Sequence, residues 1–275
     1  MASALFSSVL RRMERGDTPG VVRFGWRTFY NLLARFWRDR DWRFMNYGWL
    51  PEAGGPAIEL DPADEPDRPF IGLYDQAVRG LPVEGAHVLE VGCGRGGGAR
   101  YVARYYRPAE LVAVDFSPPA ITRARALNGD QPNLTFDVGD AERLDFPDAS
   151  FDVVINVESS HCYGDVPAFA AEVARVLKPG GWFSFADMRS SRMVEATDAA
   201  LDRPEWTRTH AGEITEGAVR ALDAADARKL SQINRLPVLR RFMREFAGTR
   251  GSALYRGLQS GKVVYLSRRY RKRDG

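Results

Sequence analysis

This sequence of 275 residues has few cysteines and no long hydrophobic run. Cys93 and Cys162 are too few for a disulfide framework or a structural zinc site, so we expect two free thiols in a reducing compartment. No stretch approaches the roughly 20 consecutive apolar residues of a membrane-spanning helix. The arginines of the opening MASALFSSVLRR follow its apolar run, whereas the positive region of a secretory signal comes first. These features predict a cytoplasmic protein.

The chain also lacks a strong overall charge, because its net charge is only +3. Residues 1–46 contain nine arginines and four acidic residues, which gives +5, and residues 268–275 carry +4. Residues 47–267 therefore hold −6. Arginines among aromatic residues such as Phe24, Trp26 and Trp37 usually form a solvated helix face. A more specific hypothesis is that this basic, aromatic N-terminal helix binds the surface of a membrane or of an acidic carrier.

The chain divides into segments of different composition. Apolar and aromatic residues at helical spacing predict amphipathic helices over 3–14 and 21–46. Proline, glycine and acidic residues without a period predict a linker over 51–69. A segment with alternating strand and helix patterns follows over 70–188, and a helix-rich insertion follows over 189–245. Residues 246–275 return to the alternating pattern and end in the basic tail.

The alternating pattern gives the fold class. Short runs rich in β-branched residues predict strands at 87–91, 111–115, 134–138, 151–157 and 182–186, with helices at 98–107, 118–127 and 165–177 between them. Such alternation predicts an α/β protein whose parallel sheet is covered on both faces and binds ligands at the carboxyl ends of its strands. Two more strands are expected at 242–248 and 262–270, around a short helix at 252–259.

A glycine-rich turn, EVGCGRGGG, follows the first predicted strand at 90–98. Glycines there let the backbone approach a ligand where a Cβ would be an obstacle. Asp115 ends the second predicted strand 19 residues after Gly96, close to the ~20 expected for a carboxylate that binds ribose. The residues of this turn fit the glycine fingerprint of dinucleotide-binding proteins only because the turn contains a run of glycines. Glu90 is unusual in that fingerprint. A nicotinamide-dependent oxidoreductase is therefore an alternative with less support.

The same turn resembles motif I of class I S-adenosylmethionine-dependent methyltransferases, and three further motifs follow in the expected order. VAVDFSPPAI (112–121) resembles the second motif, GDAERLDFPDASFDVVINVESSHCY (139–163) the third and fourth, and VLKPGGWFSFAD (176–187) the turn into the fifth strand. GRGGG, NVESSHCY, FADMR, REFAGTRGS and the last strand together look like the phthiotriolone and phenolphthiotriolone dimycocerosate methyltransferase group. Related polyketide and sugar O-methyltransferases share the likeness, which covers residues 40–270.

The resemblance implies a Rossmann-like fold with a seven-stranded, mostly parallel sheet and helices on both faces. It makes 1–69 a helical lid with its linker, 70–188 the core that binds the cofactor, 189–245 a helical cap for the substrate, and 246–275 the last core strands with the basic tail. S-adenosylmethionine is the implied cofactor. The implied cofactor-binding residues are Tyr47, Glu90, Gly92, Cys93, Gly94, Gly96, Asp115, Phe116, Ser117, Asp140, Ala141, Glu142, Asn156, Val157 and Glu158.

Histidine, the commonest general base, is scarce in this chain. His87 opens the first strand at the end away from the cofactor, and His210 lies in the insertion, where a solvated role and a pocket-lining role fit equally well. His161 follows the fourth strand, and Asp187 ends the neighbouring fifth strand. A carboxylate can orient the ring of a histidine that accepts a proton. We therefore expect His161 to be the general base with Asp187 as its partner, while a histidine that only packs on the cofactor is the alternative.

The expected acceptor is a small molecule, apolar or polyketide-like, and the expected reaction is methylation of its hydroxyl. That preference for oxygen rests on the resemblance alone, so C-methylation of an activated carbon stays open. A nucleic-acid methyltransferase is suggested by the basic ends but opposed by NVESSH after the fourth strand, so no nucleic-acid partner is expected. The carboxylate oxygens of Asp140, Glu158 and Asp187 are hard ligands that could hold a divalent metal ion, yet we expect no metal. Candidates for the acceptor pocket are Tyr30, Trp206, His210, Met243 and Tyr255.

Overall fold

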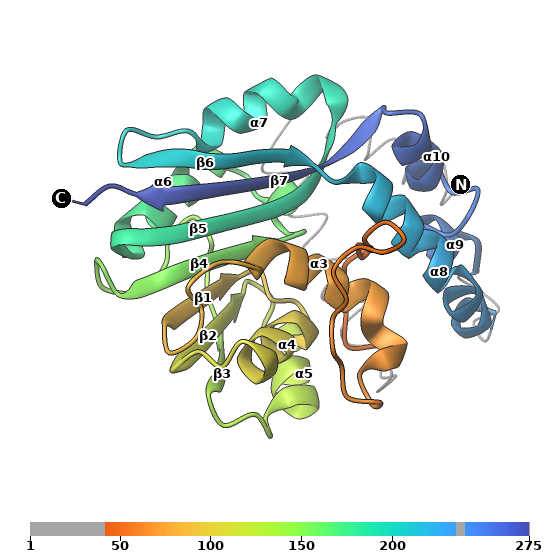
Figure 1. Ribbon diagram of the computed structural model, residues 1–275, viewed down its shortest axis with the longest axis horizontal. Coiled ribbons are helices and arrows are strands. Elements are labelled where there is room, and N and C mark those ends of the chain that lie inside the picture. The colour runs from red at the N-terminus through yellow and green to blue at the C-terminus, as the bar shows by residue number, and fades with distance from the viewer. Residues whose placement is uncertain (1–41, 235–239, 275) are drawn as a thin grey trace.

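The computed structural model describes residues 42–234 and 240–274. A seven-stranded sheet forms its centre, in the order β3-β2-β1-β4-β5-β7-β6 (Figure 1). The strands are β1 (His87–Val91), β2 (Glu110–Asp115), β3 (Leu134–Val138), β4 (Phe151–Val157), β5 (Leu177–Ser190), β6 (Trp206–Glu213) and β7 (Val263–Lys272). β1 to β5 pair in parallel, whereas β7 pairs antiparallel with β5 and with β6. The predicted seven-stranded, mostly parallel sheet is confirmed.

Helices cover both faces of this sheet (Figure 1). One apolar core joins the strands to α3 (Arg68–Val78), α4 (Gly97–Tyr105) and α5 (Pro118–Asn128), and the other joins them to α6 (Val166–Val176) and α7 (Val194–Leu201). Successive side chains of a strand point to opposite faces, so Val88 belongs to the first core and Leu89 to the second. Burial on both faces explains why β1 and β4 appear in the sequence as nearly continuous apolar runs.

The remaining helices gather at one end of the molecule (Figure 1). They are α8 (Thr215–Ile233), α9 (Arg240–Phe246) and α10 (Ala253–Gln259), and α8 contacts both of the others as well as α3. A small apolar cluster of Leu222, Leu254, Tyr255 and Leu258 holds α8 against α10. Short 3₁₀ turns at Glu65–Asp67, Ser160–Cys162 and Ser191–Met193 complete the described elements.

Two predictions about secondary structure are wrong. Residues 242–248 do not form a strand, since most of them belong to α9. Phe242 and Phe246 lie one turn apart on this helix, and their rings stack. The missing strand is β6, which falls inside the segment predicted to be helical. β6 is the outermost strand, and only Trp206 among its residues is buried, so it carries no apolar alternation.

The N-terminal prediction is wrong where the structure tests it. Residues 42–46 were expected to end a helix, but they form an irregular segment. The helix over 3–14 and the rest of the helix over 21–46 lie outside the described residues. Within the described ranges, no helix is both long enough and apolar enough to cross a membrane.

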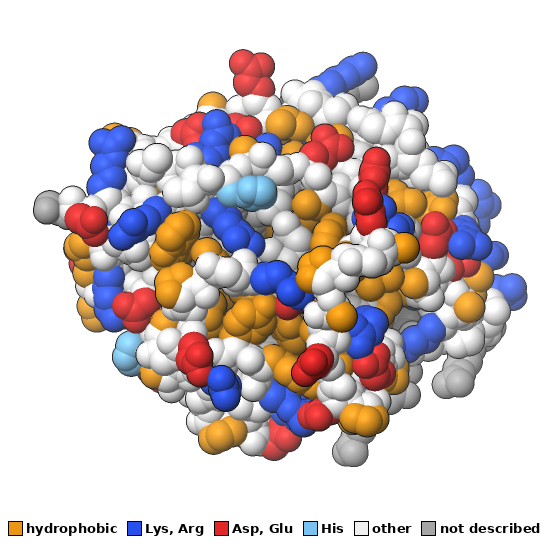
Figure 2. Space-filling model, viewed as in Figure 1, with side chains coloured by type: hydrophobic (Ala, Val, Ile, Leu, Met, Phe, Trp, Pro, Cys, Tyr) orange, Lys and Arg blue, Asp and Glu red, His pale blue; other side chains and the backbone are white. Residues whose placement is uncertain are grey.

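The basic residues near the C-terminus belong to β7 and make contacts within the fold. Arg268 is 5% exposed, and its guanidinium donates to Asp198 at 2.7 Å. Arg269 donates to the Gln76 carbonyl, and Lys272 donates to the carbonyls of Ala174 and Leu177. On the face that Figure 2 shows, acidic and basic side chains are interspersed. Part of the positive charge of this end is therefore used to join β7 to its neighbours.

Gly98 provides a test of the packing around α4. A Cβ at this position would overlap the ring of Tyr74, whose hydroxyl donates to Glu90 at 2.8 Å. In an open helix a change from Gly to Ala stabilises by about 1 kcal/mol. Here we expect Gly98→Ala to destabilise the fold by about 1–3 kcal/mol because of overpacking, as measured by urea unfolding. In a Tyr74→Ala background the cost should disappear; an equal cost there would contradict this explanation.

Candidate active site

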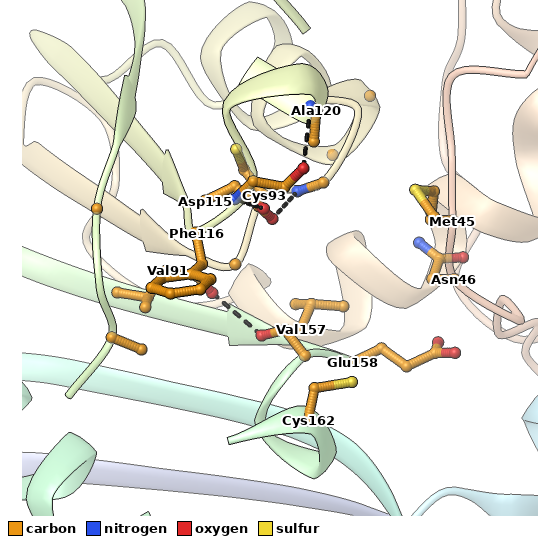
Figure 3. Close-up of a pocket in the computed structure, with 18 of the residues that line it drawn as sticks. Met45, Asn46, Val91, Cys93, Asp115, Phe116, Ala120, Val157, Glu158 and Cys162 are labelled. Carbon is orange, nitrogen blue, oxygen red and sulfur yellow. Dashed lines mark hydrogen bonds between the residues drawn. The ribbon is translucent and has the colours of Figure 1, made fainter. Parts of the chain in front are cut away.

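A pocket opens at the carboxyl ends of the central strands (Figure 3). Its wall includes the glycine-rich turn after β1, the turn after β2, residues 139–142 after β3 and residues 157–159 after β4. Cys162 and Tyr163 extend this wall, and residues 43–46 face it from the N-terminal segment. β1 and β4 are the neighbours at which the strand order changes direction, and open α/β sheets bind ligands at that point.

Most of the residues predicted to bind the cofactor lie together in this wall. They are Gly92, Cys93, Gly94, Asp115, Phe116, Ser117, Asp140, Ala141, Glu142, Val157 and Glu158. Tyr47, Glu90, Gly96 and Asn156 are not among the residues that line the pocket. The glycine-rich turn and the motifs over 112–121 and 139–163 therefore meet at one place, although some of their residues lie behind the wall, and 176–187 contributes no residue to the lining.

Two of the residues behind the wall support it. Gly96 has a φ of +77°, and a Cβ there would approach the Phe136 ring to 2.5 Å, so its lack of a side chain makes room for that ring. The Asn156 amide donates to the Val91 carbonyl at 2.9 Å, to Ser159 Oγ at 2.8 Å and to the Tyr163 hydroxyl at 2.9 Å. Ser159 and Tyr163 line the pocket. The sequence reasoning did not single them out, although both lie in the NVESSHCY motif.

Asp115 and Phe116 form one part of the wall. The Asp115 carboxylate accepts hydrogen bonds from the backbone N–H groups of Gly94 and Ser117, each at 2.9 Å. Burial raises the pKa of Asp115, and these two bonds oppose that effect. The Phe116 ring is 36% exposed, which is high for a large apolar side chain. An oriented carboxylate beside an open aromatic ring fits a ligand that has both hydroxyls and a flat ring system.

Glu90 adds an incompletely paired carboxyl behind the pocket. Its Oε1 accepts the hydrogen bond of the Tyr74 hydroxyl, and Tyr74 lines the pocket. Its Oε2 is buried, with no hydrogen-bond partner in the described part of the chain. Burial raises the pKa of Glu90 to about 7, against the effect of the Tyr74 hydroxyl. Buried polar atoms are normally paired, so this acceptor suits a ligand that brings a donor, such as an ammonium group.

Asp187 was predicted to end the fifth strand, but it lies within β5, one residue beyond the last pair with β4; it is fully buried and binds the segment that follows β4. Its oxygens contact His161 Nδ1 at 2.9 Å, the His161 N–H at 3.0 Å, Ser160 Oγ at 2.6 Å, the Met188 N–H at 2.8 Å and the Arg189 guanidinium at 3.0 Å. Burial alone would raise the pKa of Asp187, but Arg189 and His161 outweigh it and lower the pKa. The predicted pair of His161 and Asp187 is thus in contact, and Arg189, the last residue of the FADMR motif, is a partner to which the sequence analysis gave no role.

The His161 side chain is 7% exposed and is not among the residues that line the pocket, although its neighbour Cys162 is. Burial opposes a charge on the ring. The Cys162 sulfur and the Asp187 carboxylate outweigh burial and raise the pKa of His161 well above its usual value. These two groups therefore favour the protonated form of the ring.

Glu158 lies on the other side of the same turn. It has a φ of +51°, an unusual conformation for a residue with a side chain, and its carboxyl lines the pocket. Its Oε2 accepts the Tyr47 N–H at 2.9 Å and the Tyr265 hydroxyl. Burial raises the pKa of Glu158 to about 7, against these two bonds. Tyr47 therefore touches the site through its backbone, and Tyr265 on β7 is a contact that sequence spacing did not reveal.

The residues suggested for an acceptor pocket are not brought together. Trp206 stacks on Phe183 in the core, and His210 is exposed on β6. Met243 and Tyr255 are buried near α8, and Tyr30 lies outside the described residues. Within the described ranges, no three His, Cys, Asp or Glu side chains are grouped as they would be around a metal ion.

Comparison with known proteins agrees with this geometry. A family model described as "Methyltransferase domain" matches residues 89–185. A phthiotriol/phenolphthiotriol dimycocerosates methyltransferase of Mycobacterium tuberculosis is 36% identical over 263 residues, which cover 94% of this chain and 96% of the relative. A fatty-acid O-methyltransferase of Mycolicibacterium smegmatis is 39% identical over 211 residues, covering 72% and 73%.

Among solved structures, the [4+2]-cyclase SpnF superimposes with a TM-score of 0.70 at 18% identity, covering 90% of this chain and 95% of its own. That likeness concerns the fold alone. The long match to the mycobacterial enzyme and the matching domain model identify the activity class. The chain belongs to the family of the phthiotriol/phenolphthiotriol dimycocerosates methyltransferases and is an S-adenosylmethionine-dependent methyltransferase.

Proposed function

We propose that this enzyme methylates a hydroxyl group of a lipid-like or polyketide-like molecule, with S-adenosylmethionine as methyl donor and His161 as general base. The observation that carries the proposal is the contact between His161 Nδ1 and the buried Asp187 carboxylate at 2.9 Å, directly after the strand that borders the pocket. The relatives named for phthiotriol lipids support a lipid acceptor. Their high coverage of this chain supports the same kind of reaction here.

The residues of the pocket fit S-adenosylmethionine. Asp115 would accept hydrogen bonds from the ribose hydroxyls, and the exposed ring of Phe116 would pack on the adenine. The unpaired Oε2 of Glu90 offers an acceptor for the amino group. When bound, the cofactor supplies a methyl group on a positively charged sulfur. The carboxyls of Glu90, Asp115 and Glu158 in and behind the wall favour a cation there.

His161 would take the proton of the acceptor hydroxyl. A neutral alcohol is a poor nucleophile, and a positioned base contributes about 10² to 10⁴ in rate. Asp187 occupies Nδ1, so the proton must be taken at Nε2. Asp187 holds the ring and offsets its positive charge, while Arg189 pairs with the same buried carboxylate. A base of this kind must be uncharged before it acts, which sets the expected dependence on pH.

Cofactor identity is tested by equilibrium binding. We expect S-adenosylhomocysteine to bind in titration calorimetry and Asp115→Ala to weaken it about 10- to 100-fold, because hydrogen bonds to a charged group are lost. Glu216→Gln is a matched control, because it also removes one acidic charge and its side chain is 85% exposed on α8. Binding of NAD in place of S-adenosylhomocysteine would refute the proposed cofactor.

The role of His161 is tested by the dependence of rate on pH. Because its pKa is raised, the fraction of neutral ring grows as the pH rises, so turnover of a phthiotriol lipid should increase through a pKa above the usual 6.5. Asp187→Asn removes the charge that favours the protonated ring, so the pKa should fall, as seen by NMR of the histidine rings. His161→Gln should lower turnover about 10² to 10⁴-fold and leave binding of S-adenosylhomocysteine unchanged. Turnover equal to wild type would exclude His161 as the base.

A further inference from the structure

We propose that Glu158 selects and orients a hydroxyl acceptor: its Oε1 accepts the hydrogen bond of the acceptor hydroxyl when the substrate binds, before that single hydrogen turns to His161 for removal, and its charge rejects acceptors that carry a carboxylate. This inference rests on the proposed methylation of a hydroxyl, and it deepens that proposal by naming the residue that separates two acceptor classes. The sequence analysis assigns Glu158 to the cofactor, whereas this inference assigns it to the acceptor.

The geometry around Glu158 leaves one oxygen for a ligand. Both hydrogen bonds that the described residues donate to its carboxyl, from the Tyr47 N–H and the Tyr265 hydroxyl, end on Oε2. Among the described residues nothing donates to Oε1. Two donors on Oε2 fix the rotation of the carboxyl, so Oε1 is held in one position within the pocket wall. Figure 3 shows the side chain extending from the end of β4 toward the segment with Met45 and Asn46.

Asn46 supplies a second unfilled acceptor to the same pocket. It is 8% exposed and lines the pocket, and its amide nitrogen donates to the Phe70 carbonyl at 3.2 Å. Its Oδ1 has no partner in the described part of the chain. Buried acceptors are costly when they remain unpaired, so this part of the wall favours a ligand that brings a donor. A hydroxyl can donate to them, whereas a carboxylate brings only further acceptors.

Three charged or titratable groups interact with Glu158, namely Lys229, His161 and Asp187. Lys229 of α8 has its ammonium engaged by the Ala247 carbonyl at 3.0 Å and by the rings of Tyr47 and Phe70. His161 favours the charged form of Glu158, and Asp187 opposes it. With its pKa at about 7, Glu158 is a carboxylate in mildly alkaline solution, where it accepts a hydrogen bond from a hydroxyl and repels a second carboxylate. One relative is named for a phthiotriol lipid and another for a fatty acid, so the family includes both acceptor classes.

The test compares two probes of equal chain length, dodecan-1-ol and dodecanoate. Their binding to the full chain is measured at pH 8.5 with saturating S-adenosylhomocysteine, so no turnover is required. Wild type should bind the alcohol more tightly than the acid, and Glu158→Gln should reduce this ratio by about tenfold or more, since a bond to a charged group and a charge repulsion are both lost. Affinity for S-adenosylhomocysteine should stay within about twofold.

Two further variants serve as controls, one for the position of the oxygen and one for the loss of a negative charge elsewhere. Glu158→Asp keeps the charge but withdraws the oxygen by one methylene, so it should lose affinity for the alcohol and still reject the acid. Glu216→Gln, an exposed change of the same charge, should keep the wild-type ratio. An unchanged ratio in Glu158→Gln, tighter binding of dodecanoate by wild type, or a large loss of S-adenosylhomocysteine affinity in Glu158→Gln would each overturn the inference. Failure of wild type to methylate any hydroxyl lipid would instead refute the proposed function.

Discussion

The site depends on one buried carboxylate, that of Asp187. A charge without solvent is costly unless it is paired and hydrogen-bonded, and this one gathers donors from the turn after β4 and from the end of β5. The side chain of His161 and the backbone of the turn are both held by it. The turn is therefore fixed relative to β5, and the pocket wall that it contributes is rigid before a ligand arrives.

A second carboxyl, that of Glu158, joins separate parts of the chain at the same place. Its Oε2 connects the N-terminal segment through Tyr47 with β7 through Tyr265, and the Tyr47 hydroxyl reaches the Phe246 carbonyl of α9. The part of the pocket at which Glu158 lies is thus built from segments far apart in the sequence. The likeness to a [4+2]-cyclase at a TM-score of 0.70 shows that this fold alone does not determine a reaction. The side chains at the strand ends must do so.

Sequence patterns predict the parts of this structure that depend on local spacing. The buried strands β1 to β5 and the glycine turn have strong local signals, and the contact of His161 with Asp187 follows from two neighbouring strand ends. β6 escapes prediction because an exposed edge strand has no apolar period, and α9 is mistaken for a strand because its aromatic residues suit both structures. The contacts of Glu158 with Tyr47 and Tyr265 span more than 100 residues each, so no motif encodes them.

The most direct test of this account is a crystal structure of the enzyme with S-adenosylhomocysteine and a hydroxyl lipid. The account predicts the ribose on Asp115 and the sulfur toward the end of the pocket where Glu158 lies. It also predicts the lipid hydroxyl within about 2.6–3.2 Å of Glu158 Oε1, the range of a hydrogen bond. A hydroxyl bound elsewhere, or the cofactor amino group on Glu158 in its place, would contradict it.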